Sequence, residues 1–110
     1  MKLTDMFSLQ GKVALVTGGG RGIGKFIATG LAEAGANIIL TSRKIKNLEA
    51  TAAELAATYK VKTAAIPCDM AKEDTVDAML REAVEKLGRI DILVNTPGAT
   101  WGAPTLEFPL

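Results

Sequence analysis

The sequence has no histidine and only one cysteine, Cys68. A single cysteine excludes an internal disulfide, and without histidine neither a zinc site nor a histidine-based catalytic triad is expected. We therefore expect no metal site and a reducing, cytoplasmic location. We expect Cys68 itself to behave as a small buried apolar residue.

Blocks of like charge and long apolar runs are also missing. Thirteen basic and twelve acidic residues leave a net charge of +1, so we expect neither nucleic acid nor a membrane surface as a partner. The first residues are too polar for a signal peptide, and no apolar run reaches transmembrane length. The 110 residues have room for one small domain.

Short β-branched runs alternate regularly with amphipathic segments. Strands are predicted at residues 12–17, 36–42, 63–67 and 90–95, and helices at residues 23–34, 45–59 and 76–87. This alternation is typical of a parallel sheet with right-handed crossovers. The sequence therefore predicts an α/β fold, followed after residue 95 by a loop rich in proline and glycine.

The amphipathic pattern also predicts which side of each helix is buried. The first helix is expected to end at Gly35 and the third at Gly88. The predicted buried faces are Ile23, Ile27, Leu31 and Ala34 in the first helix; Ile45, Leu48, Ala52, Leu55 and Tyr59 in the second; and Val76, Met79, Leu80, Ala83, Val84 and Leu87 in the third.

A glycine cluster, "LVTGGGRGIGK", follows the first strand and opens the first helix. Its glycines Gly18, Gly22 and Gly24 are spaced as G-x-x-x-G-x-G, whereas the usual dinucleotide fingerprint is G-x-G-x-x-G. Glycines there allow a tight turn and a close approach of phosphates to the helix N-terminus. On composition alone, a phosphate-binding loop and a plain strand–helix turn are equally open.

The longer string "TGGGRGIG" resembles the T-G-x-x-x-G-I-G signature of the short-chain dehydrogenases/reductases. "SRK" after the second strand, "CDM" after the third and "DILVNTPG" after the third helix stand where that family has similar stretches. The resemblance extends over residues 7–98, the N-terminal part of a typical member. "MFSLQGKVALVTGG" and "GATWGAP" are most similar to members of the 3-oxoacyl reductase and gluconate 5-dehydrogenase type.

The resemblance implies the N-terminal half of a Rossmann-type, doubly wound parallel sheet with strand order 3-2-1-4 and three helices. It also implies an NADP(H)-binding half-domain over residues 1–98 and a loop over residues 99–110. The residues implied to bind the cofactor are Gly18, Gly19, Gly20, Arg21, Gly22, Ile23 and Gly24 at the phosphates and adenosine ribose, Asp69 with Met70 at the adenine, Asn95 near the cofactor ribose, and the retained Gly98.

Ser42 and Arg43 indicate which nicotinamide cofactor is bound. Enzymes that prefer NAD usually carry an acidic residue near the end of the second strand, and none is present here. Arg43 could instead form paired hydrogen bonds with the 2′-phosphate of NADP(H), aided by the Ser42 hydroxyl, although the basic residues there could simply be solvated at a helix start.

Other positions keep two interpretations. Asp69 could be a helix N-cap or turn residue as well as an adenine contact. Thr17 is expected either to brace the loop after the fourth strand through its hydroxyl, as the family implies, or to be an ordinary β-branched strand residue. Thr96 and Pro97 replace the family's second asparagine and its alanine, and proline removes a backbone donor there.

No residue is expected to be catalytic. The family uses a serine and a Tyr-x-x-x-Lys pair, but the single tyrosine, Tyr59, has no lysine four positions later.

One functional hypothesis is therefore a truncated or partial NADP(H)-dependent oxidoreductase whose complete, homo-oligomeric form acts on a small carbonyl or alcohol. The alternative is a non-catalytic nucleotide-binding or interaction module. The 110-residue chain alone is expected to be inactive and poorly stable, because the fourth strand would leave an uncovered edge.

Overall fold

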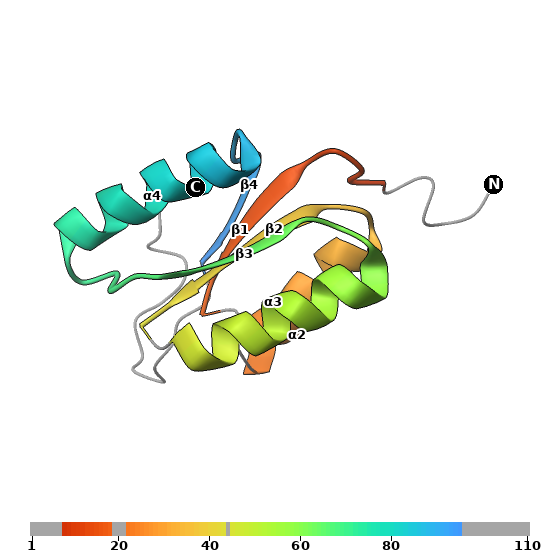
Figure 1. Cartoon of the computed structure of the whole chain (residues 1–110), viewed down its shortest axis with the longest axis horizontal. Helices are drawn as coiled ribbons and strands as arrows, with labels where there is room; N and C mark the ends of the chain where they lie inside the picture. Colours follow the sequence, from red (N-terminus) through yellow and green to blue (C-terminus); the bar gives the residue numbers. More distant parts are fainter. Residues whose placement is uncertain (1–7, 19–21, 44, 96–110) are drawn as a thin grey trace.

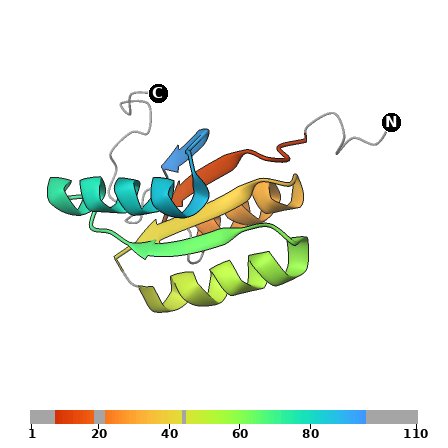
Figure 2. The same ribbon diagram turned by 45° about the horizontal axis from the view of Figure 1, so that its top comes forward.

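The fold is a four-stranded parallel sheet with helices on both faces, and the computed structural model describes residues 8–18, 22–43 and 45–95. The elements follow one another as β1 (Val13–Thr17), α2 (Gly22–Glu33), β2 (Asn37–Ser42), α3 (Ile45–Tyr59), β3 (Thr63–Pro67), α4 (Glu73–Leu87) and β4 (Ile92–Asn95). The strands pair in the order β3-β2-β1-β4, which can be followed in Figure 2. The predicted fold class and strand order are therefore confirmed.

Helices α2 and α3 cover one face of the sheet, and α4 covers the other (Figure 1). Successive side chains of β1 alternate between the two faces. Ala14 and Val16 pack with α2 and α3, whereas Val13 and Leu15 pack with α4. Strands β1 and β2 lie between the other two; β1 is buried throughout and β2 at its four central residues, as expected for strands covered on both faces.

Helix α2 packs on the sheet through small side chains. Gly24, Ala28 and Ala32 are buried, whereas Ile23 is 74% exposed. The predicted buried face through Ile23 is therefore wrong at that residue, and Ile27 is only half-buried. Residues four apart share one face of a helix, and three small ones let the helix backbone lie close to the strands.

Helix α4 buries only part of its apolar stripe. Met79 and Ala83 are buried, but Leu80 is 37% and Val84 47% exposed. The predicted stripe is thus wider than the surface that the sheet covers. The predicted helix end is confirmed, because Gly88 has a φ of 88° and its N–H donates to the Val84 carbonyl at 2.7 Å.

Further predictions about packing can be checked in α3, at Gly35 and at Cys68. Leu48, Ala52 and Leu55 of α3 are buried, as its periodicity predicts. Gly35 adopts a φ of 103° after α2, the left-handed conformation expected of a helix stop. Cys68 is 4% exposed, so its predicted burial is confirmed.

The amino ends of β1 and β4 are held together by Asp91. Its Oδ2 accepts the Val13 N–H at 2.8 Å and a 2.9 Å hydrogen bond from Arg89 Nε, while its own N–H donates to the Val13 carbonyl. The backbone hydrogen bond from Val13, followed by the Arg89 guanidinium, lowers the pKa of Asp91 below its ordinary value.

Among the described helices, none is long and apolar enough to cross a membrane.

Candidate functional site

The carboxyl ends of all four strands meet at one edge of the sheet, because the strands are parallel. Two backbone hydrogen bonds continue the pairing into the connections that leave this edge. The Gly18 N–H donates to the Thr41 carbonyl at 2.6 Å, and the Cys68 N–H donates to the Ser42 carbonyl at 2.8 Å. The connections after β1, β2 and β3 therefore start from fixed positions beside one another.

A side-chain hydrogen bond joins the ends of β1 and β4. Thr17 and Asn95 are register partners, and the Thr17 hydroxyl donates to Asn95 Oδ1 at 2.9 Å. The Thr17 hydroxyl thus braces the last residue of β4, whereas the loop after β4, which it is predicted to brace, lies outside the described residues. Because Oδ1 accepts this bond, the orientation of the Asn95 carboxamide is fixed at the point where β1 and β4 adjoin.

The turn between β1 and α2 uses backbone conformations that favour glycine. Gly18 has a φ of 69° and Gly22 a φ of 67°, and Gly24 is buried against the sheet. The first turn of α2 holds no acidic residue, so no carboxylate of its own lies at the positive end of this helix. Gly19, Gly20 and Arg21, also predicted to bind the cofactor, lie outside the described residues, as does Gly98.

Ser42 and Arg43 lie where β2 leaves the sheet. Ser42 is half-buried and Arg43 is exposed, and no carboxylate stands at the end of this strand. The strand therefore presents a hydroxyl and a guanidinium at the edge, next to the connection that begins at Gly18.

Asp69 and Met70 lie where β3 leaves the sheet. Asp69 Oδ1 accepts the Ala71 N–H at 3.0 Å, which makes Asp69 a turn residue as one interpretation predicts. The N-cap interpretation is wrong, because the N-cap of α4 is Lys72. Met70 is 48% exposed, and its Sδ lies 3.7 Å from Cys68 Sγ, so an exposed apolar side chain with its sulfur against Cys68 follows Asp69 in the chain.

Thr41 is a polar residue at this edge that the sequence reasoning did not assign. It pairs with Thr17 in register and is fully buried, and its hydroxyl has no hydrogen-bond partner among the described residues. Asn95, Thr17 and Thr41 thus form a polar row across β4, β1 and β2 at the carboxyl edge. The signal in the sequence is a threonine within the apolar run "IILTS".

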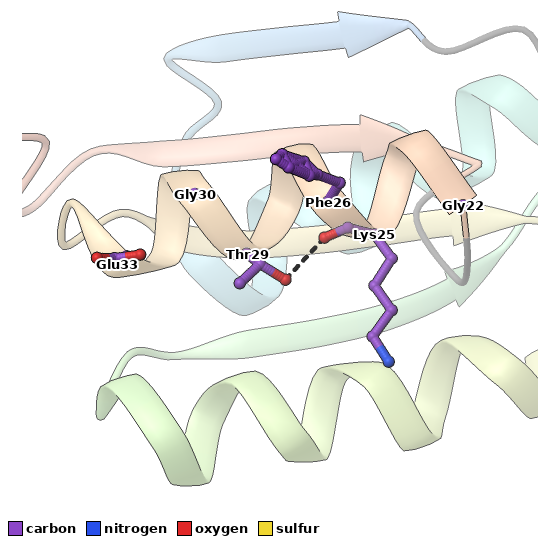
Figure 3. A pocket seen from close by; sticks show the side chains of 6 residues that line it. All are labelled: Gly22, Lys25, Phe26, Thr29, Gly30 and Glu33. Atoms are coloured by element: carbon purple, nitrogen blue, oxygen red, sulfur yellow. Dashed lines mark hydrogen bonds between the residues drawn. The ribbon is translucent and has the colours of Figure 1, made fainter.

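A shallow hollow of about 430 Å³ lies along the outer side of α2 (Figure 3). Its lining residues are Gly22, Lys25, Phe26, Thr29, Gly30 and Glu33. Lys25 points toward α3, where its Nζ forms a 3.2 Å ion pair with Glu54. Gly22 also belongs to the turn between β1 and α2, so the hollow reaches the edge where the strands end at that residue, while its other lining residues follow α2. In the described ranges, no cluster of three or more His, Cys, Asp or Glu side chains could hold a metal ion.

Comparison with known proteins finds clear relatives. The chain is 42% identical over 104 residues to a 3-oxoacyl-acyl-carrier-protein reductase of rhamnolipid biosynthesis from Pseudomonas aeruginosa, a match that covers 94% of this chain and 40% of that protein. It is 42% identical over 109 residues to a 2-dehydro-3-deoxy-D-gluconate 5-dehydrogenase from Pseudoalteromonas atlantica, covering 96% of this chain and 41% of that protein.

Solved structures agree with these sequence matches. The crystal structure of L-sorbose reductase from Gluconobacter frateurii, complexed with NADPH and L-sorbose, matches with a TM-score of 0.81 and 34% identity. That match covers 93% of this chain and 39% of the reductase, so the chain spans about two fifths of the length of these relatives. The profile of the short chain dehydrogenase family matches residues 12–110. The chain therefore belongs to the short chain dehydrogenase family.

Proposed function

We propose that this chain is the cofactor-binding part of an oxidoreductase and binds the adenosine and pyrophosphate of NADP(H) where its four strands end. The observation that carries this proposal is the glycine turn from β1 into α2, placed where β1 adjoins β4. In open α/β sheets, the strand order reverses at such a point, and ligands bind in the crevice beside it. Residues 1–98 would form this cofactor-binding unit.

The residues of the glycine turn suit a pyrophosphate. The backbone of Gly18 and Gly22 turns without side chains, and an added Cβ at Gly22 would meet no atom within 4 Å. The unpaired N–H groups of the first helical turn would donate to phosphate oxygens. Under this proposal the contacting segment is Gly18, Gly19, Gly20, Arg21, Gly22, Ile23 and Gly24.

Arg43 supports the choice of NADP(H) over NAD(H). An exposed guanidinium can form two parallel hydrogen bonds with a phosphate, and Ser42 beside it offers a hydroxyl. An acidic residue at this position would instead repel a 2′-phosphate, and β2 ends without one. The NADPH complex of L-sorbose reductase is consistent with this choice.

The remaining contacts would lie on either side of the glycine turn. Asp69 would accept a hydrogen bond from the adenine, with the exposed Met70 packing on the ring. Asn95 and Gly98 would lie near the ribose on the nicotinamide side. The bound cofactor supplies hydride exchange with a carbonyl or alcohol, and this chain's residues bind and orient it.

No acid–base group of the reaction is proposed from this chain. Tyr59 is the last residue of α3, which begins near the carboxyl end of β2 and leads to the amino end of β3. It therefore lies at the far end of the sheet from the proposed site, half-buried against the core under α2 and α3. We assign proton transfer, and recognition of a small carbonyl or alcohol substrate, to parts of the relatives' length that this chain does not cover.

The cofactor preference can be tested by calorimetry with NADPH and NADH on the purified chain. We expect NADPH to bind more tightly, and Arg43→Ala to weaken NADPH binding about tenfold while leaving NADH binding unchanged, since a charged hydrogen-bonded pair contributes on the order of 1.5–3 kcal/mol. Arg81→Ala removes the same charge from an exposed position on α4 and is the matched control. Equal affinities for the two cofactors, or an unchanged preference in Arg43→Ala, would contradict the assignment.

A further inference from the structure

The Thr75 hydroxyl holds the connection between β3 and α4 at three backbone atoms. Its Oγ1 accepts the Asp69 N–H at 3.2 Å and lies 2.6 Å from the Asp69 carbonyl oxygen and 2.8 Å from the Lys72 carbonyl oxygen. A hydroxyl has one proton and two lone pairs, so it can accept from the N–H while it donates to one carbonyl at a time. One side chain thus binds both backbone polar groups of Asp69.

Among the described residues, no other side chain hydrogen-bonds to the backbone of Asp69 at the start of α4. Lys72, the N-cap residue, makes no side-chain capping hydrogen bond. Thr75 instead reaches back from the first turn of the helix across six residues of sequence to Asp69. Because the backbone of Asp69 is fixed at its N–H and its carbonyl, the direction of its Cα–Cβ bond is fixed as well.

The carboxylate of Asp69 is oriented by the same turn. Its Oδ1 accepts the Ala71 N–H, and the Lys72 N–H donates to the Asp69 carbonyl at 2.9 Å. Thr75 is half-buried, with Cys68 Sγ 3.7 Å from its hydroxyl. The hydroxyl therefore holds a residue that stands at the edge of the sheet from the first turn of the following helix.

We infer that Thr75 is a positioning residue for the adenine end of the nucleotide site, acting only through Asp69. The inference rests on the proposed function, in which Asp69 contacts the adenine. Removal of the hydroxyl leaves the Asp69 turn held only by the Ala71 and Lys72 N–H groups, and the carboxylate is then less firmly preorganised. Thr75 touches no part of the ligand itself.

The test compares Thr75→Val, which keeps the shape but removes the hydroxyl, with Thr75→Ser, which keeps the hydroxyl. Affinities are measured by calorimetry on the 110-residue chain for 2′-phospho-ADP-ribose and for inorganic pyrophosphate, which has no adenine. We expect Thr75→Val to bind 2′-phospho-ADP-ribose about fivefold more weakly, as for one lost hydrogen bond. Pyrophosphate binding should not change, and Thr75→Ser should bind both ligands as the parent does.

A double-mutant cycle separates this role from a general loss of stability. In an Asp69→Ala background, Thr75→Val should cause no further loss of 2′-phospho-ADP-ribose affinity, because the residue through which it acts is gone. Equal weakening of both ligands, or additive losses in the double mutant, would overturn the inference. Unfolding by urea is followed for each variant, and Thr75→Ala replaces Thr75→Val if the valine variant does not fold.

Failure of the proposed function gives a different result. If Asp69→Ala binds 2′-phospho-ADP-ribose as well as the parent does, the adenine contact itself is refuted. If Asp69→Ala weakens binding but Thr75→Val does not, the proposed function stands and the positioning role of Thr75 is wrong.

Discussion

Replacing Thr41 by valine should stabilise the protein. Thr41 is fully buried in β2, and its hydroxyl has no hydrogen-bond partner in the described part of the chain. Burial of a hydroxyl without a partner costs on the order of 1–3 kcal/mol, and valine has nearly the same shape with a methyl group in its place. We therefore expect Thr41→Val to raise the free energy of unfolding by about 1–2 kcal/mol.

Thr17→Val is the matched control, because Thr17 is the register partner of Thr41 and is 3% exposed. Its hydroxyl donates to Asn95, so the same substitution removes a hydrogen bond that is made. We expect Thr17→Val to lower the free energy of unfolding by about 1 kcal/mol. Two chemically identical changes on neighbouring strands should thus have opposite signs.

Urea unfolding followed by circular dichroism measures both variants. A change in the midpoint at constant slope reports stability, and about 1 kcal/mol corresponds to roughly 4–8 °C in the thermal midpoint of a domain of this size. If Thr41→Val destabilises the protein as much as Thr17→Val does, the hydroxyl of Thr41 has a partner and the reasoning is refuted.

Two further predictions concern glycines and pH. Gly30→Ala should stabilise the protein by up to about 1 kcal/mol, because an added Cβ at this position in α2 meets open space. Gly35→Ala should destabilise it, because φ is 103° and the new Cβ would lie 3.2 Å from the Gln10 Cα. The thermal unfolding midpoints of the two variants should therefore shift in opposite directions. Asp91 has a lowered pKa, chiefly through the Val13 N–H, so its stabilising contribution is present above its ordinary pKa and is lost as the pH falls through the lower folded value. The stability difference between the parent and Asp91→Asn should therefore shrink on acidification, and a difference that stays constant in acid titration would contradict the assignment.

The order and type of the elements could be predicted because each depends on a local pattern. The apolar run of β2 and the spacing of Leu48, Ala52 and Leu55 in α3 are properties of short stretches, and the structure confirms both. The outward side of α4 could not be predicted in the same way. Leu80 and Val84 belong to its apolar stripe, but only the placement of the neighbouring elements decides how much of a stripe is covered.

The polar groups at the carboxyl edge were only partly predictable for a similar reason. Asp69 could be a cap or a turn residue, because both roles use a short carboxylate ahead of a helix, and only the start of α4 at Glu73 decides between them. The pairing of Thr17 with Thr41 joins distant residues, and such a contact exists only once the strand register is set. The bonds from Thr75 to Asp69 are local, but they depend on the turn by which the connection enters α4.

The burial of Gly24 connects the packing of α2 with the proposed binding site. Sequence reasoning ranked residues by apolarity and so expected Ile23 to face the sheet, but the buried residues are Gly24, Ala28 and Ala32. The last glycine of the motif therefore continues a line of small residues along the underside of the helix. Gly18 and Gly22, with positive φ, shape the turn, whereas Gly24 lets the first turn of α2 lie close to the strands. In the G-x-x-x-G-x-G spacing, the first two glycines thus set the conformation of the loop and the third sets the position of the helix N-terminus. A pyrophosphate bound at the ends of β1 and β4 would require both.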